Sequence, residues 1–171
     1  MDTLKAVLVV FLAVLVQVSV LGGYSPLGGR ADVLLVVLLS LALLRGSVFG
    51  AIAGFGAGLL VDIANLGTMG FTSLLLTVAG FWIGRYGETT ARDRFHAPYL
   101  SVGLVTVLYA LGALALLFVL GDAVPAHSVL ASLPAGVLWN LILTLPVYAL
   151  VRRLFPPGDA SDRIHEVRLL A

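Results

Sequence analysis

Three aspartates are the residues in this chain whose chemistry could go beyond helix packing. Asp32, Asp62 and Asp122 each lie at the border of an apolar run, on the same expected side of a membrane. Two carboxylates that converge there could serve as the general acid and base of an aspartic-type intramembrane peptidase. The asparagine-rich and glycine–alanine motifs that surround the aspartates of such enzymes are absent from the sequence. We therefore expect ordinary interface positions for Asp32 and Asp122, and no enzymatic activity.

Histidine and serine give no stronger signal for catalysis. His127 and Ser128 are adjacent in an expected loop, and no Gly-x-Ser-x-Gly elbow is present to expose a nucleophile. The three histidines, His96, His127 and His165, are scattered over loops and tail on both sides of the expected membrane, so no shared metal site follows. The chain has no cysteine, which excludes disulfides, Cys-ligated zinc and Fe–S clusters. We expect neither a metal nor a cofactor.

The composition predicts an all-α integral membrane protein. Of the 171 residues, 60% are hydrophobic and 11% are charged, and the mean hydropathy is +1.10. The net charge of +1 argues against nucleic-acid binding. We predict a single transmembrane domain over residues 1–151 and a short cytoplasmic tail over 152–171. Six apolar runs predict six transmembrane helices, at residues 4–21, 31–44, 46–64, 70–84, 99–120 and 129–151.

The second run is short for a transmembrane helix. Residues 31–44 cover only about 21 Å of a hydrocarbon core that is roughly 30 Å thick. This run could borrow a turn from the preceding loop, lie where the membrane is thinned, or be re-entrant. A five-span variant follows if it does not span.

Basic residues predict the orientation through the positive-inside rule. Six spans with a cytoplasmic N-terminus place nine of the ten basic residues in the cytoplasm and only Arg30 outside. A rival topology, with a non-spanning second run and an external N-terminus, also places nine of ten inside, because Lys5 and Arg30 exchange sides while Arg45 stays cytoplasmic. We prefer six spans, since residues 33–44 are rich in Leu and Val and are interrupted only by Ser40. Both termini are then cytoplasmic.

The third run carries small residues along one side. We name as the glycine stripe the four glycines that recur every four residues: Gly46, Gly50, Gly54 and Gly58. Small residues at this spacing let another helix approach closely. The partner helix is either a neighbour in the same fold or the single transmembrane helix of another protein. At the outer end of the run, Asp62 is expected to cap the helix or anchor the turn that contains Asn65, with contact to a partner protein as the alternative.

Two amides lie inside the predicted bundle. Gln17, near the outer end of the first run, either hydrogen-bonds across helices or is a tolerated interfacial amide. Asn140 lies at mid-depth in the last run, and we expect it to satisfy a neighbouring helix or a carbonyl freed by Pro146 rather than to bind a ligand.

The third and fourth runs together resemble a known family. The residues Gly54-Phe55, then Gly58 through Asp62, then Gly70 and finally Gly80 through Arg85 resemble the G-F-x-x-G-L-L-x-D…G…G-y-x-x-G-R pattern of the rod shape-determining protein MreD family. Chain length, the glutamine near the end of the first run and the charged central loop are similar as well.

This resemblance implies a non-enzymatic, multi-pass subunit of the cell-elongation machinery in the bacterial plasma membrane, where it would help to organise peptidoglycan synthesis. It implies association with an MreC-like single-span protein and, through it, with MreB, RodA and a class B penicillin-binding protein. The family's fold is similar to the substrate-binding subunits of energy-coupling-factor vitamin transporters, which supply the alternative function. The short outer loops, poor in polar side chains, favour the first interpretation.

Overall fold

The computed structural model describes residues 2–21, 31–66, 68–90, 97–121 and 126–155. Within these ranges the chain is helical, without strands, as the composition predicts. The elements are α1 (Asp2–Val16), the π-helical turn η1 (Gln17–Leu21), α2 (Val33–Arg45), α3 (Ser47–Ala64), α4 (Phe71–Thr90), α5 (Ala97–Leu120) and α6 (Ala126–Leu154).

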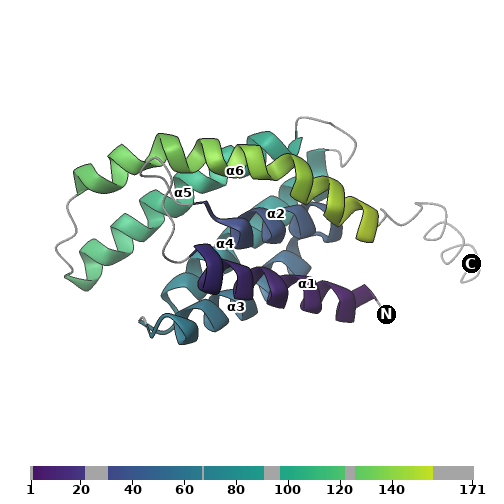
Figure 1. The fold of residues 1–171 in the computed structure, drawn as a ribbon, viewed down its shortest axis with the longest axis horizontal. Coiled ribbons are helices and arrows are strands. Elements are labelled where there is room, and N and C mark those ends of the chain that lie inside the picture. The colour runs from purple at the N-terminus through teal and green to yellow at the C-terminus, as the bar shows by residue number, and fades with distance from the viewer. Residues whose placement is uncertain (1, 22–30, 67, 91–96, 122–125, 156–171) are drawn as a thin grey trace, which may run out of the picture.

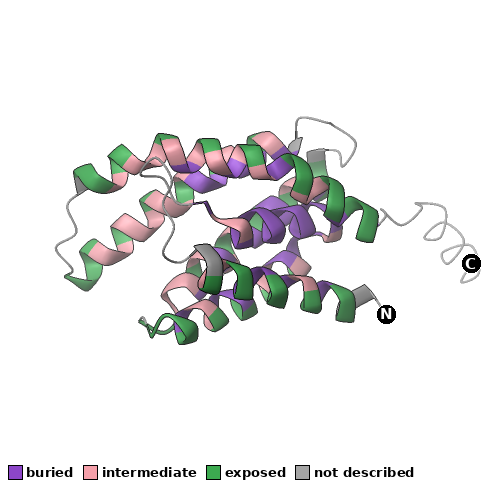
Figure 2. Ribbon diagram, in the orientation of Figure 1, coloured by how far each residue is buried: buried purple, intermediate pink, exposed green. Residues whose placement is uncertain are grey.

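The short helix α2 forms the centre of the bundle. It contacts each of the other five α-helices, and every residue from Leu34 to Leu44 is buried. Figure 2 shows this helix as the most completely buried element, with α5 and α6 on one side and α1 and α3 on the other. Because protein rather than lipid surrounds α2, it does not need the length of a lipid-exposed span. Ala31 and Asp32 are not helical, so α2 borrows no turn from the residues before it.

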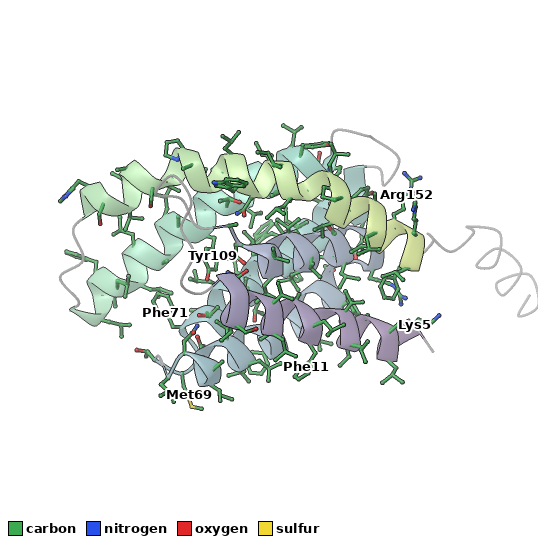
Figure 3. The ribbon with its side chains drawn as sticks, in the orientation of Figure 1. Lys5, Phe11, Met69, Phe71, Tyr109 and Arg152 are labelled. Atoms are coloured by element: carbon green, nitrogen blue, oxygen red, sulfur yellow. The ribbon has the colours of Figure 1, made fainter. Side chains whose placement is uncertain are left out.

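The basic residues at the start of α1 and at the end of α6 lie at the same end of the bundle. Figure 3 shows Lys5 and Arg152 at one end of the bundle, and Met69 and Phe71 toward the other. Arg45, the last residue of α2, packs its guanidinium over the ring of Phe155, 5.0 Å from the ring centre, next to the end of α6. The rival topology would separate Lys5 from Arg152 by the whole membrane.

Several helix bounds differ from those expected from hydropathy. The segment 85–97 was predicted to be a solvated loop, but α4 continues to Thr90. Helix α6 begins at Ala126 and ends at Leu154, so His127 and Ser128 lie in its first turn rather than in a loop, and Arg152 and Arg153 lie in its last turn rather than in the tail. In each case the helical hydrogen bonds of the backbone continue past the end of the apolar run into polar residues. Hydropathy reports the lipid boundary and not the helix boundary.

Three helices are long and apolar enough to cross a membrane: Ser47–Ala64, Pro98–Leu120 and His127–Leu154. The shorter apolar helices are Leu4–Ser19 and Val33–Arg45. Large apolar side chains on α5 and α6, such as Leu104, Leu108, Ile142 and Leu145, are more than half exposed in the isolated chain. Exposed apolar ridges of this kind suit a lipid-facing surface.

Candidate functional site

The glycine stripe is covered by α4. A Cβ atom built on Gly50 would lie 2.3 Å from the carbonyl oxygen of Gly80, and one on Gly54 would lie 2.3 Å from that of Leu76. At Gly58 the nearest atom would be Cα of Ser73, at 2.2 Å. The backbones of α3 and α4 are therefore in direct contact along the stripe. Of the two partners considered from the sequence, the structure places a helix of the same fold there, and this face is closed to another protein.

Glycines on α4 complete the same contact from the other side. A Cβ on Gly80 would lie 2.2 Å from the carbonyl oxygen of Gly50, and one on Gly84 would lie 2.4 Å from that of Gly46. Gly46 itself, with φ of +97°, is the turn between α2 and α3, a backbone conformation that favours glycine. The fourth predicted run thus contributes its own small residues to the α3–α4 interface.

Asp62 holds the start of α4. It is buried, with 4% of its surface exposed, although it belongs to α3. Its carboxylate accepts hydrogen bonds from the backbone N–H groups of Gly70 (2.9 Å), Thr72 (3.1 Å) and Ser73 (3.4 Å). An acceptor at a helix N-terminus satisfies donors that have no partner within the helix and interacts favourably with the helix dipole. The anchor expected at Asp62 therefore acts on the next helix rather than on the Asn65 turn, and burial removes Asp62 from contact with a partner protein.

Glu88 performs the same task at the opposite end of the pair. It lies near the end of α4, beyond the apolar segment 70–84, and its carboxylate accepts from the backbone N–H of Ser47 (2.7 Å) and from its hydroxyl (3.0 Å). Ser47 is the first residue of α3. These hydrogen bonds, aided by the Arg85 guanidinium 3.6 Å away, lower the pKa of Glu88 below its ordinary value of 4.5. Helices α3 and α4 each cap the other's N-terminus with a carboxylate.

The two predicted amides meet at the start of α2. Gln17 accepts from the backbone N–H of Val33 (2.9 Å) through Oε1 and donates to the carbonyl of Ala31 (3.3 Å) through Nε2. Asn140 accepts from the backbone N–H of Asp32 (2.8 Å) and donates to the hydroxyl of Thr106 (3.1 Å). The structure therefore places Asn140 against neighbouring helices rather than against the carbonyl four residues before Pro146.

Asp32 completes this cluster as the N-cap of α2. Its carboxylate accepts from the backbone N–H of Leu35 at 2.9 Å. Side chains from η1 and α6 thus converge on the start of a helix that begins inside the protein, and Thr106 of α5 binds one of them. Asp32 was expected to be an ordinary interface residue, and the capping contact is a function that the sequence alone did not identify. An aspartate directly before an apolar run is the signal that could have found it.

A cavity of about 650 Å³ is lined by the start of α2. We name it the α2 recess. Its polar lining includes Gln17, Asp32, Asn65, Thr106, Tyr109 and Asn140, and its apolar lining comes largely from α5 and α6. The sequence argument against a small-molecule pocket considered only the outer loops. The polar groups of the recess come mainly from helices and not from loops.

The two aspartates that the structure describes in these positions each hold the start of a helix. The carboxylate of Asp62 is occupied by the first turn of α4, and that of Asp32 caps α2. Asp122, His96 and His165 lie outside the described residues. Among the residues that the structure describes, no group of three or more His, Asp or Glu side chains is placed to hold a metal ion.

Comparison with known proteins gives one match. The family model described as "rod shape-determining protein MreD" matches residues 3–154, which is nearly all of the chain and, apart from Asp2, the full length of the described helices. No curated protein and no solved structure matches.

Proposed function

The chain belongs to the family of the rod shape-determining protein MreD, and on this basis we propose that it is a non-enzymatic, multi-pass subunit of the cell-elongation machinery in the bacterial plasma membrane. The match to the family model over residues 3–154 is the main observation in favour of this proposal. The carboxylates support it, because Asp62 and Glu88 are engaged in holding helices together.

Its direct partner in this proposal is an MreC-like single-span protein, which connects it to MreB, RodA and a class B penicillin-binding protein. The glycine stripe is filled by α4, so the partner's helix would dock on a lipid-facing apolar side of the bundle. Association of helices in lipid relies on close packing and not on the hydrophobic effect. A smooth apolar ridge with an exposed small residue, such as the one around Gly56, is compatible with such docking.

The proposed orientation has both termini in the cytoplasm. Lys5 and Arg152 lie at the same end of the bundle (Figure 3). Arg45 packs over Phe155 beside the end of α6, and Arg85 lies near Glu88, which binds Ser47 directly after Arg45 and Gly46. Basic residues favour the cytoplasmic side. Partner contacts with the cytoplasmic MreB would then come through this end or through the partner protein itself.

A second candidate function is a substrate-binding subunit of an energy-coupling-factor vitamin transporter. The α2 recess is the observation that favours it, since a pocket with converging polar groups is what such a subunit needs. The family match favours the first candidate.

Affinity purification from the native host in mild detergent separates the two. Recovery of a single-span MreC-like protein together with wall synthases is the expected result. A matched control uses an unrelated multi-pass protein with the same tag, to remove proteins that adhere to any apolar surface. Recovery of an energy-coupling ATPase module instead, with a vitamin, would overturn the proposal in favour of the transporter.

A further inference from the structure

Two contacts hold the ends of four helices at the same level at one end of the bundle. The guanidinium of Arg45, the last residue of α2, lies 5.0 Å from the ring centre of Phe155, directly after α6. The carboxylate of Glu88 on α4 accepts from the backbone N–H of Ser47, the first residue of α3, at 2.7 Å. We name this the Arg45 end of the bundle. Differences in length between these helices therefore appear at the opposite end, which we name the far end.

Helices α5 and α6 extend beyond α3 at the far end. Asn140 of α6 accepts from the backbone N–H of Asp32, just before α2, and donates to Thr106 of α5. From this level, α5 continues from residue 106 to 120 and α6 extends from residue 140 back to 126, which is about 21 Å in each helix. Helix α3 has 18 residues and α2 has 13, so α3 continues only about 7 Å beyond the same level. Helices α5 and α6 therefore reach roughly 14 Å farther than α3, measured along the helices, and Figure 1 shows them protruding beyond α1 and α3.

The protruding part of α5 has an apolar surface. Residues 111–120, with the sequence LGALALLFVL, contain no polar side chain. Phe118 is 83% exposed, Val119 78% and Leu120 52%. A continuous apolar surface of this kind needs apolar surroundings, which the hydrocarbon of the bilayer provides. The hydrocarbon region beside α5 therefore reaches close to the end of this helix.

The far end of α3 and α4 is polar, although it lies nearer to the Arg45 end. Asn65 and Thr68 are exposed in the turn between these two helices. The backbone groups of a turn need water or protein as partners, which hydrocarbon does not supply. On α4 the apolar residues 71–84 cover only about 21 Å before the exposed Arg85, whereas Pro98–Leu120 of α5 covers about 35 Å. The apolar surface is thus shorter on the α3–α4 side than on the α5–α6 side.

A tilt of the whole protein does not remove this difference. Tilting shifts the two polar boundaries of one side together, so the apolar length between them on that side stays the same. A bilayer with a core of about 30 Å is thicker than the α4 segment needs, and a short apolar segment is accommodated by local thinning of the bilayer.

We propose that the bilayer is thinner beside α3 and α4 than beside α5 and α6, with the protein at a step between the two thicknesses. The α3–α4 face accordingly binds phospholipids with short acyl chains best, and the α5–α6 face prefers longer chains. The inference rests on the membrane location of the family and on the apolar helices. It does not depend on the proposed protein partners.

Single cysteines test for the step, because the natural chain has none. Thr68→Cys lies in the polar turn, and Ala115→Cys lies at an exposed position of α5, roughly 6 Å beyond the level at which α3 ends. The full chain in dioleoylphosphatidylcholine nanodiscs, which expose both membrane surfaces, is labelled with a water-soluble maleimide. We expect Thr68→Cys to react about tenfold faster or more, because the reactive thiolate is disfavoured in hydrocarbon.

The same two variants in SDS provide the control, since both cysteines should then react at similar rates. A flat bilayer would make position 115 at least as accessible as position 68. Equal rates in nanodiscs, or a faster reaction at position 115, would therefore overturn the proposal.

Tryptophan fluorescence measures which lipids contact each face. The natural Trp82 and Trp139 are replaced by phenylalanine. A single reporter is then placed by Phe55→Trp on α3 or by Phe118→Trp on α5, two positions that are more than half exposed. Quenching by dibrominated dioleoylphosphatidylcholine in mixed vesicles gives the affinity of each face for the shorter dimyristoleoyl and the longer dierucoyl phosphatidylcholine. We expect the short-to-long affinity ratio to be about threefold higher or more at position 55 than at position 118.

Equal ratios at the two positions, or a higher ratio at position 118, would contradict the proposal. A reporter that brominated lipid does not quench would show that protein rather than lipid covers that face, and this result would overturn the proposal as well. The cysteine measurement needs neither reporter, so the step is tested even where a tryptophan variant does not fold.

Discussion

Gly54→Ala is expected to destabilise the bundle, whereas Gly56→Ala, two residues along the same helix, is not. A Cβ atom on residue 54 would lie 2.3 Å from the carbonyl oxygen of Leu76 and 2.6 Å from its carbonyl carbon, and ordinary contact begins at 3.4 Å. The obstacle is backbone, so no side chain can rotate out of the way. Helices α3 and α4 would have to separate locally by about 1 Å. A Cβ on Gly56 meets nothing within 4 Å.

The pair of variants isolates the contact energy. Overfilling a close contact costs about 1–3 kcal/mol, and we expect the upper part of that range because several backbone atoms are involved. Replacing glycine by alanine within a helix is itself favourable by about 0.5–1 kcal/mol, and this gain applies to both positions. The difference in unfolding free energy between the two variants therefore measures the clash without the propensity effect.

The assay is unfolding by SDS titration in mixed micelles, followed by far-ultraviolet circular dichroism. Gly54→Ala should unfold at a lower SDS fraction than the wild type, and Gly56→Ala at the same or a higher fraction. Cell-shape complementation in the native host provides a functional readout of the same pair. Equal stability of the two variants would refute the inferred backbone contact between α3 and α4.

Changes at three further positions test the capping contacts by the same titration. Asp62→Ala removes the acceptor for the start of α4 and should cost about 1–2 kcal/mol, with Asp62→Asn costing less; equal stability of both to the wild type would show that the cap is not important. Because hydrogen bonds from Ser47 lower the pKa of Glu88, its contribution is complete above the ordinary value of 4.5 and is lost as the pH falls through the lower folded-state pKa. The stability difference between the wild type and Glu88→Gln should therefore shrink on acidification below pH 4.5, and a difference independent of pH would contradict this linkage. Asn140→Leu leaves the N–H of Asp32 without its acceptor and should cost about 1–3 kcal/mol, so an unchanged unfolding midpoint would count against the cluster at α2.

The helical fold was predictable from the sequence because segments that lie in the bilayer must be apolar, and their hydropathy is visible in the sequence. Apolar runs mark where a chain crosses lipid, and the backbone must then be helical. The ends of α4 were not predictable by the same means. Arg85 and Glu88 end the apolar run, yet the helix continues to Thr90. The tertiary contacts made beyond the run explain this, since a Cβ on Gly87 would meet Leu43 of α2 and Glu88 caps Ser47 of α3.

The site was predictable only in part. Polar side chains in apolar runs drew attention to Gln17, Asp62 and Asn140 as residues that could need partners. Which partners they find depends on contacts between distant segments. Asn140 bonds to the backbone of Asp32, 108 residues earlier in the chain. The stripe of small residues predicted a close helix contact, but its spacing is the same whether the neighbouring helix belongs to the same chain or to another protein.

The α2 recess and the stability of the bundle share one cause. A helix that begins inside a membrane protein exposes N–H donors where no water is available, so side chains must supply acceptors. Gln17, Asp32 and Asn140 supply them at α2, and by doing so they make this part of the recess polar. Removing any one of these three side chains would therefore leave a backbone N–H at the start of α2 without its acceptor.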